Sequence, residues 1–321
     1  MALKLKPQAQ TYNHKIHGVS QSILTTYMAC RKKSELKLAG WRPVRMGKAM
    51  VFGILAHDVI GEAFSELSEP PSLAWVQKKL REAMAKVAAE NGRMSAESLE
   101  EMNHSAAVLA GILPLYFQNY ASEFDKANWL MVESNFNVNI PGVPFPMVGR
   151  YDRVRRVNGK PWLYETKTKS RIEDDYLTEM LHFDIQDGVY LQAILAELKE
   201  MPCGVVYDVL RNPGLKQKVA EGDDAFLARI IDDVKARPEF YFIRYEVAID
   251  KAEMSSFATE LSRIAQDFDW WRAGKLPTFK NTMACKTSWG MCEMMPICAR
   301  EDYSNFHQRV EMFPELKETK K

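Results

Sequence analysis

The sequence has no long apolar run and no excess of either charge. None of its hydrophobic stretches reaches the roughly 18 residues that a transmembrane helix needs, so we expect no membrane association. Lys and Arg total 43 against 42 Asp and Glu, which excludes a globally basic nucleic-acid-binding protein. Any contact with nucleic acid should then come from a local basic cluster. Residues 31–48 are one candidate for such a cluster, and a solvated helix face is the other interpretation.

Several motifs are also missing. The opening segment MALKLKPQAQ has no apolar core of a secretory signal, so we expect a cytoplasmic protein. The absence of a GxxxxGK[ST] motif argues against a P-loop nucleotide-driven motor, and no internal repeat or low-complexity tract is present. The chain has only five cysteines. In a reducing compartment these are expected to be ligands or buried thiols, not a disulfide framework.

Apolar spacing divides the chain into parts. After a flexible lead at 1–19, residues 20–126 show helical spacing and are expected to form a helical N-terminal part. Strands and helices alternate from 127 to 275, followed by a Cys-rich segment at 276–300 and a charged tail at 301–321. We expect these parts to form one compact domain.

The central part predicts an α/β fold. Strands are expected at 130–140, 147–157, 160–168 and 204–210, with a helix at 175–199, and a single helix is expected earlier, at 20–38. The order helix, three strands, helix, strand (αβββαβ) is typical of a mixed sheet flanked by helices. The helical N-terminal part and the Cys-rich C-terminal segment would be additions to this core.

A hairpin carries the most informative residues. Asn158 and Gly159 separate the runs VGRYDRVRRV and KPWLYETKT, and such a pair is the strongest local signal for a two-residue turn. Counting outward from the turn places Asp152 opposite Glu165, with Lys167 on the same face as Glu165. Two carboxylates and an ammonium at this spacing predict a cation site beside a positive group. A solvated charge patch neutralised by Lys167 is the alternative.

Two helical motifs flank the hairpin in sequence. In FGILAHDVIGEAF, Gly53, His57 and Gly61 fall on one helix face, where the glycines let another element approach the histidine. In DIQDGVY, Gln186 and Tyr190 share a helix face after the lysine.

The order of these motifs resembles the PD-(D/E)XK nuclease superfamily, specifically its RecB-like branch. That branch includes the CRISPR-associated RecB-like exonucleases and the nuclease domain of AddB. The resemblance extends from about Ser20 to Cys298. It implies a PD-(D/E)XK-type core and DNA as the partner.

The resemblance implies a role for each residue of the hairpin. His57, Asp152 and Glu165 would bind Mg²⁺ or Mn²⁺, with the backbone carbonyl of Thr166 as a further ligand. Lys167 would orient or deprotonate the attacking water and help to neutralise the phosphate. Oxygen ligands suit such hard cations, which stabilise the charge that grows on a phosphate.

Three further residues are assigned in the same way. The resemblance implies that Gln186 and Tyr190 position substrate near the metal. Glu133, in the strand before the hairpin, would support the site, and an exposed strand glutamate is the alternative.

The cysteines form a second pattern. Cys285, Cys292 and Cys298 cluster in CKTSWGMCEMMPIC, while Cys30 lies near the other end of the chain. This arrangement resembles the iron–sulfur members of the family and implies a [4Fe–4S] cluster that joins the two ends. A Cys₄ zinc site and buried thiols are the alternatives. The wide gap between Cys285 and Cys292 leaves the type of site open.

We therefore expect a metal-dependent deoxyribonuclease, an exonuclease acting on DNA ends or single strands in recombination, repair or phage and CRISPR-type DNA processing. Other recombination or adaptation proteins are possible partners. The alternative is a non-catalytic DNA-binding or complex-assembly subunit joined by a zinc or iron–sulfur site.

Overall fold

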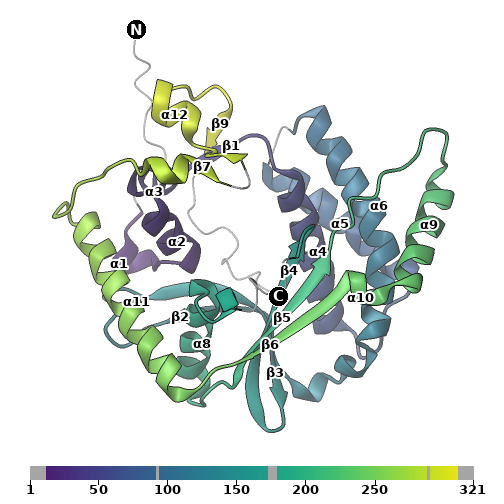
Figure 1. Ribbon diagram of the computed structural model, residues 1–321, viewed down its shortest axis with the longest axis horizontal. Coiled ribbons are helices and arrows are strands. Elements are labelled where there is room, and N and C mark those ends of the chain that lie inside the picture. The colour runs from purple at the N-terminus through teal and green to yellow at the C-terminus, as the bar shows by residue number, and fades with distance from the viewer. Residues whose placement is uncertain (1–11, 92–93, 173–178, 288–289, 310–321) are drawn as a thin grey trace.

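A five-stranded sheet forms the centre of the molecule (Figure 1). The computed structural model describes residues 12–91, 94–172, 179–287 and 290–309. The strands, in spatial order, are β2 (Trp129–Val138), β3 (Met147–Val157), β4 (Lys160–Lys169), β5 (Gly204–Arg211) and β6 (Phe242–Ala248). Neighbouring strands are antiparallel except for β4 and β5, which are parallel and joined through a helix. The expected α/β fold with a mixed sheet is confirmed.

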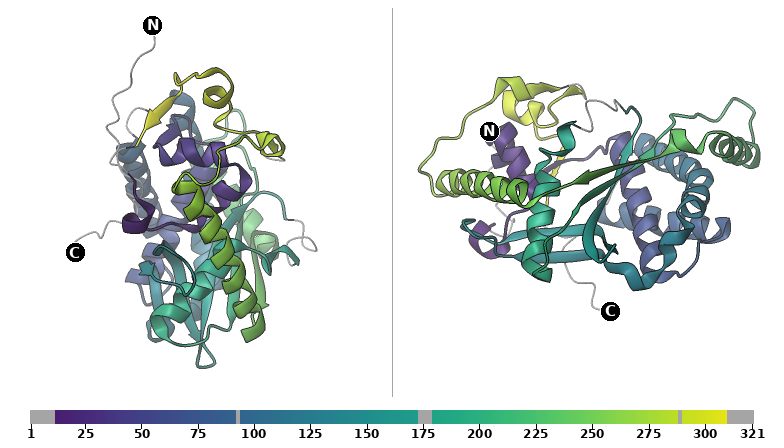
Figure 2. Two further views of the ribbon diagram at one scale, coloured as in Figure 1. Left: turned by 90° about the vertical axis from the view of Figure 1, so that its left-hand side faces the viewer. Right: turned by 60° about the horizontal axis from the view of Figure 1, so that its bottom comes forward.

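Helices cover both faces of this sheet (Figures 1 and 2). One group comprises α4 (Lys48–Glu66), α5 (Leu73–Asn91), α6 (Ala96–Asn119) and α9 (Asp223–Ala236). The other comprises α2 (Gln21–Ala29), α8 (Ile185–Leu198) and α11 (Lys251–Arg272). Shorter helices are α1 (His14–His17), α3 (Arg31–Leu38), α10 (Pro238–Tyr241) and α12 (Met295–Arg300), with 3₁₀ turns η1 (Ala121–Phe124), η2 (Lys126–Asn128) and η3 (Thr282–Cys285). No helix in the described ranges is long and apolar enough to cross a membrane.

Each helical group buries its own apolar core against the sheet. Phe64 of α4 and Phe117 of α6 belong to the first core, which reaches Leu210 of β5. The second core contains Val189 of α8 and Phe268 of α11. Because the sheet is covered on both faces, polar side chains within it need partners from the helices or from neighbouring strands.

Two adjacent strands depart from regular alternation at the same level. Met131 and Phe136 of β2 both pack in the second core, and so do Tyr151 and Val154 of β3. Residues an odd number apart on a regular strand face opposite sides. Each strand therefore rotates between its two core residues, and in β2 the intervening Glu133 has a positive φ of 46°.

The predicted single helix at 20–38 is wrong. It is two helices, α2 and α3, because Cys30 between them has an extended backbone with φ −164°. The helix expected at 175–199 includes α8, which begins at Ile185 after the Asp184 cap, and residues 173–178 lie outside the described ranges. Within the expected lead 1–19, the described residues form α1 and bury Val19 completely.

The N-terminal and C-terminal segments lie side by side. Strand β1 (Trp41–Pro43) pairs with β9 (Phe306–Gln308), and β7 (Lys286–Thr287) pairs with β8 (Gly290–Met291). A small core of Leu36, Met294 and Ile297 joins α3 to α12. This unit sits at the top of Figure 1.

Candidate active site

The hairpin that carries the candidate site has the register predicted from its turn. The strands pair from Val157 with Lys160 through Arg153 with Tyr164. Asn158 and Gly159 have φ values of 50° and 80°, as a tight hairpin turn requires at both central positions.

The Asp152 carboxylate lies just beyond these backbone pairs. Its Oδ2 accepts a hydrogen bond from the Thr166 amide at 2.8 Å, and its Oδ1 lies 3.3 Å from His57 Nδ1. Burial opposes ionisation of Asp152, but His57, Lys167 and the Thr166 amide together hold its pKa below the usual range. Asp152 is therefore an ionised carboxylate at neutral pH.

Glu165, Lys167 and Gln186 form a closed triangle of hydrogen bonds. Lys167 Nζ donates to Glu165 Oε1 at 2.7 Å and to Gln186 Oε1 at 2.8 Å. Gln186 Nε2 also donates to Glu165 Oε1, at 2.5 Å. Gln186 occupies the first turn of α8, where Asp184 caps the helix by accepting from the Gln186 amide. The predicted common face of Glu165 and Lys167 is thus observed, with Gln186 joined to both.

The second oxygen of Glu165 is buried and unsatisfied. The residue is 1% exposed, and Oε2 has no hydrogen-bond partner among the described residues. Burial and the neighbouring Asp152 raise the pKa of Glu165 to about 7, against the opposing effect of Lys167. A buried oxygen without a partner is costly, and a cation would satisfy it.

His57 reaches this level of the sheet because α4 packs closely on two strands. A Cβ on Gly53 would lie 3.2 Å from Thr168 Oγ1, and one on Gly61 would lie 2.4 Å from Glu133 Cγ. Burial opposes protonation of His57, but Asp152 and Glu133 outweigh it and raise its pKa to about 9. The two glycines thus allow the close approach that their spacing predicts.

Glu133 stands in register opposite Asp152. The flanking pairs are Val132 with Arg153 and Ser134 with Tyr151. Arg150 Nε lies 3.1 Å from Glu133 Oε2. Burial raises the pKa of Glu133 to about 7, with Asp152 adding to the shift and Arg150 opposing it. Glu133 is therefore a partly buried neighbour of the site, which argues against an exposed strand glutamate.

Tyr190 is packed among rings one helical turn beyond Gln186. Its ring lies 5.4 Å from Phe136 and 5.8 Å from Tyr151, and the residue is 7% exposed. Burial, Glu165 and Asp152 all raise its pKa. The hydroxyl is therefore a neutral group at the inner edge of the site.

The donor set suits a hard divalent cation, but the side chains hold one another. Within the described ranges, no three His, Cys, Asp or Glu side chains are arranged as a set that could hold a metal. Asp152 contacts His57 and Thr166, whereas Glu165 contacts Lys167 and Gln186. One imidazole and two carboxylates nevertheless fit Mg²⁺ or Mn²⁺ chemically, and the unsatisfied Glu165 Oε2 marks where an acceptor is free. The role of the Thr166 backbone carbonyl as a further metal ligand stays a prediction.

Sequence reasoning missed two groups of polar residues near the site. Asp187 of α8 is 3% exposed, and neither carboxylate oxygen has a hydrogen-bond partner among the described residues. Arg153 and Asp208 form a fully buried ion pair at 2.7 Å, on the other side of the sheet from Tyr151. A buried ion pair has no local sequence signal. In the sequence, Asp187 cannot be told apart from the acidic residues that are common in the first turn of a helix.

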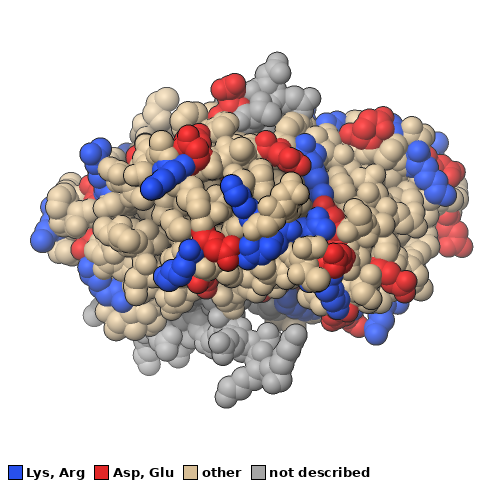
Figure 3. Space-filling view, turned by 90° about the horizontal axis from the view of Figure 1, so that it is seen from below, with Lys and Arg blue, Asp and Glu red and all other residues tan. Residues whose placement is uncertain are grey.

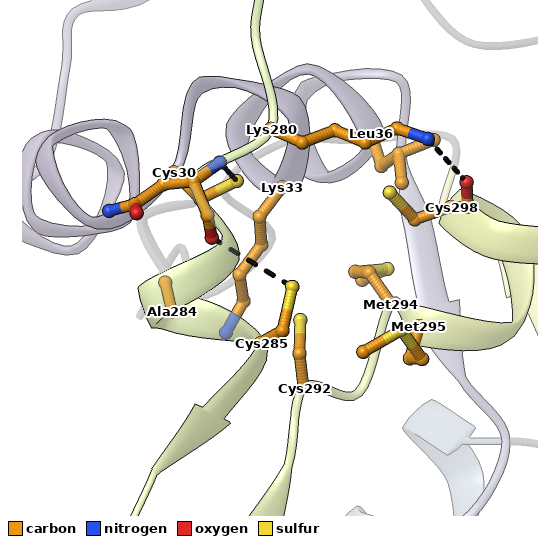
Figure 4. A pocket seen from close by; sticks show the side chains of 11 residues that line it. Cys30, Lys33, Leu36, Lys280, Ala284, Cys285, Cys292, Met294, Met295 and Cys298 are labelled. Carbon is orange, nitrogen blue, oxygen red and sulfur yellow. Dashed lines mark hydrogen bonds between the residues drawn. The ribbon is translucent and has the colours of Figure 1, made fainter.

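The four predicted ligand cysteines surround one cavity (Figure 4). Cys30 comes from the α2–α3 junction, Cys285 from η3, Cys292 from the loop before α12, and Cys298 from α12. The cavity has a volume of about 20 Å³, and Leu36 and Met294 are among its other lining residues. All four thiols are free and half-buried. Segments from both ends of the chain thus present thiols to a common centre.

The basic run at 31–48 is largely neutralised. Acidic partners lie within 4 Å of Arg31, Lys32, Lys33, Lys37, Arg45 and Lys48. Glu293 alone accepts from two of these lysines. On the face shown in Figure 3, basic and acidic side chains are also interspersed. This run is accordingly a poor candidate for a DNA-binding patch.

Comparison with known proteins identifies the family. No curated protein matches the chain. Among solved structures, a "Putative exonuclease" from Eubacterium rectale aligns with a TM-score of 0.48 and 12% identity, covering 93% of this chain and 100% of that one. SSO0001 aligns with a TM-score of 0.29 and 17% identity, covering 68% of this chain and 84% of that one. The family model of the PD-(D/E)XK nuclease superfamily matches residues 18–299, and the chain therefore belongs to that superfamily.

Proposed function

We propose that the protein is a divalent-metal-dependent DNA nuclease of the RecB-like branch that acts as an exonuclease on DNA ends or single strands. The observation that carries this proposal is the triangle of Glu165, Lys167 and Gln186 beside Asp152 and His57. A buried carboxylate with one free oxygen, next to a half-buried ammonium, suits phosphodiester hydrolysis better than a structural role. We place this activity in recombination, repair or phage and CRISPR-type DNA processing.

His57, Asp152, Glu165 and the Thr166 carbonyl would hold Mg²⁺ or Mn²⁺. When bound, such a cation stabilises the negative charge that develops on the phosphate. Asp152 is ionised and already oriented by the Thr166 amide. Glu165 is held by Lys167 and Gln186 through Oε1, which leaves Oε2 free.

Lys167 would orient water and neutralise phosphate charge. An ammonium has three donors, of which two are used by Glu165 and Gln186, so the third can reach a phosphate oxygen or water. Burial opposes protonation, but Glu165 outweighs it and raises the pKa of Lys167. A lysine held in its charged form favours the orienting role over that of a proton acceptor.

The test is DNA degradation by Lys167→Ala. We expect Mn²⁺-dependent degradation of end-labelled DNA to fall about 100-fold or more, with the fold retained as judged by circular dichroism. Lys160→Ala is the matched control, because Lys160 is exposed at the other end of the same strand. Product lengths on single- and double-stranded DNA separate exonuclease from endonuclease action. Wild-type activity in Lys167→Ala would refute the assignment, and inactive wild-type protein that binds DNA would favour the non-catalytic alternative.

We further propose that Cys30, Cys285, Cys292 and Cys298 hold a [4Fe–4S] cluster that joins the two ends of the chain. Four thiols around one cavity support a cluster or a Cys₄ zinc site. The expected result is a brown protein with about four iron and four sulfide ions per chain. A colourless protein purified without oxygen, with one zinc ion per chain, would decide for zinc.

A further inference from the structure

A row of polar side chains crosses the sheet next to the metal-binding residues. Arg153, Thr166, Asp208 and Arg244 come from β3, β4, β5 and β6, one from each strand. Thr166 and Asp208 are register partners, as are Asp208 and Arg244. We call these four residues the cross-strand row.

Hydrogen bonds connect the row from end to end. Arg153 Nη2 donates to Thr166 Oγ1 at 2.9 Å and to Asp208 Oδ2 at 2.7 Å. Arg244 donates to both oxygens of Asp208 at 3.1 Å. Tyr116 of α6 adds a further hydrogen bond to Asp208. Asp208 is thus held by three donor side chains.

Three members of the row are sealed from water, and the fourth, Arg244, is partly exposed. Arg153, Thr166 and Asp208 are each exposed by 1% or less. The Arg153 guanidinium lies 4.6 Å from the Phe64 ring centre. Removing one partner from such a buried pair would leave a charge without compensation, which is strongly destabilising. The position of these strands along one another is therefore strongly fixed at this point of the sheet.

Thr166 connects the row to the site. Its hydroxyl accepts from Arg153, and its backbone amide donates to Asp152 Oδ2 at 2.8 Å. Arg153 directly follows Asp152, and Thr166 directly follows Glu165. Both acidic residues are therefore one peptide away from a member of the row, at the level where β2 and β3 depart from regular alternation.

We propose that Arg153 is a positioning residue: through Thr166, the cross-strand row sets the position of Asp152 relative to Glu165 and thereby the affinity of the site for its divalent cation. This inference rests on the proposed function. The alternative is that the row only stabilises the fold.

The test measures Mn²⁺ binding to the full-length protein by calorimetry, without DNA. Thr166→Val keeps the shape of the side chain and the backbone amide but removes the acceptor of Arg153. We expect the Mn²⁺ dissociation constant to rise about 10- to 100-fold, as is typical when a group that orients a metal ligand is removed. Thr166→Ser, which keeps the hydroxyl, should restore wild-type affinity.

Tyr116→Phe is the control for stability alone. It removes the hydrogen bond to Asp208 and a longer one from Arg153 at 3.4 Å. The bond between Arg153 and Thr166 stays, so the melting temperature should fall while Mn²⁺ affinity stays at the wild-type value. Equal affinities of wild type, Thr166→Val and Thr166→Ser would overturn the proposal, as would equal losses in Thr166→Val and Tyr116→Phe.

If Thr166→Val does not fold, Arg153→Lys takes its place, because a lysine keeps the charge but not the forked geometry. Unchanged Mn²⁺ affinity in Arg153→Lys also overturns the proposal. Wild-type protein that binds no Mn²⁺ would instead refute the proposed function.

Discussion

Two glycines of α4 allow a sharp test of how the helix carries His57 to the sheet. Gly53 and Gly61 lie four residues before and after His57. An alanine Cβ at Gly61 would lie 2.4 Å from Glu133 Cγ and 2.7 Å from its Oε1, whereas at Gly53 the nearest atom is Thr168 Oγ1 at 3.2 Å. The same substitution therefore meets a severe clash at one position and a tight contact at the other.

The two variants should differ in stability for this reason alone. Replacing glycine by alanine inside a helix stabilises the folded state by about 1 kcal/mol, and this gain is common to both variants. Overpacking costs about 1–3 kcal/mol and applies in full only to Gly61→Ala. We therefore expect Gly53→Ala to be as stable as wild type or more stable, and Gly61→Ala to be less stable than Gly53→Ala by about 1–3 kcal/mol.

Urea denaturation of both variants measures this difference directly. In Gly61→Ala the displaced Glu133 should also move away from Arg150, so Mn²⁺ affinity should fall, while Gly53→Ala keeps it. Adding Glu133→Ala to Gly61→Ala removes the clashing atoms, so the double variant should be more stable than the sum of the single changes predicts. Equal stability of the two glycine variants would show that α4 does not approach β2 this closely, and the contact between His57 and Asp152 would lose its basis.

Two further predictions concern buried acids. Burial, Asp184 and Glu165 raise the pKa of Asp187 well above its usual value, so this carboxyl costs stability once the pH exceeds its unfolded pKa of about 4. In metal-free buffer, Asp187→Asn should raise the free energy of unfolding at pH 7 by about 1–3 kcal/mol, and this gain should shrink toward pH 4. A variant less stable than wild type at pH 7 would contradict this. Asp208 is the opposite case, because Arg244 and Arg153 outweigh burial and lower its pKa to about 2. The ionised Asp208 contributes about 2 kcal/mol to the free energy of unfolding above pH 4, and this contribution is lost as the pH falls toward 2. Between pH 4 and pH 2, the free energy of unfolding of Asp208→Asn should therefore fall less than that of wild type.

The hairpin could be predicted from sequence because its turn has two residues. Asn158 and Gly159 both adopt positive φ, and such a turn leaves a single register for the strands that it joins. Counting outward then placed Asp152 opposite Glu165, with Lys167 on the same face as Glu165. The face of α4 that carries His57 was predictable for a similar reason, since helical spacing is local.

The partners of charged residues could not be predicted in this way. The basic run at 31–48 reads as a surface patch, yet its partners include Glu97, Asp267 and Glu293, far along the chain. Arg153 and Asp208 likewise come together only when β3, β4 and β5 assemble. Sequence spacing reports neighbours on the same element and is silent about those that the tertiary fold supplies.

The break in alternation explains why the site residues themselves escape the regular strand pattern. Strict alternation would place Tyr151 and Arg153 on one face, with Asp152 on the other. Tyr151 instead donates to Glu197 of α8, while Arg153 lies over Phe64 of α4. Asp152 therefore sits where β3 rotates, and this is why one of its oxygens can meet His57 from the α4 side while the other meets the Thr166 amide of the neighbouring strand. A regular strand would present both oxygens to one face, so the irregularity is what brings a helix and a strand to the same carboxylate.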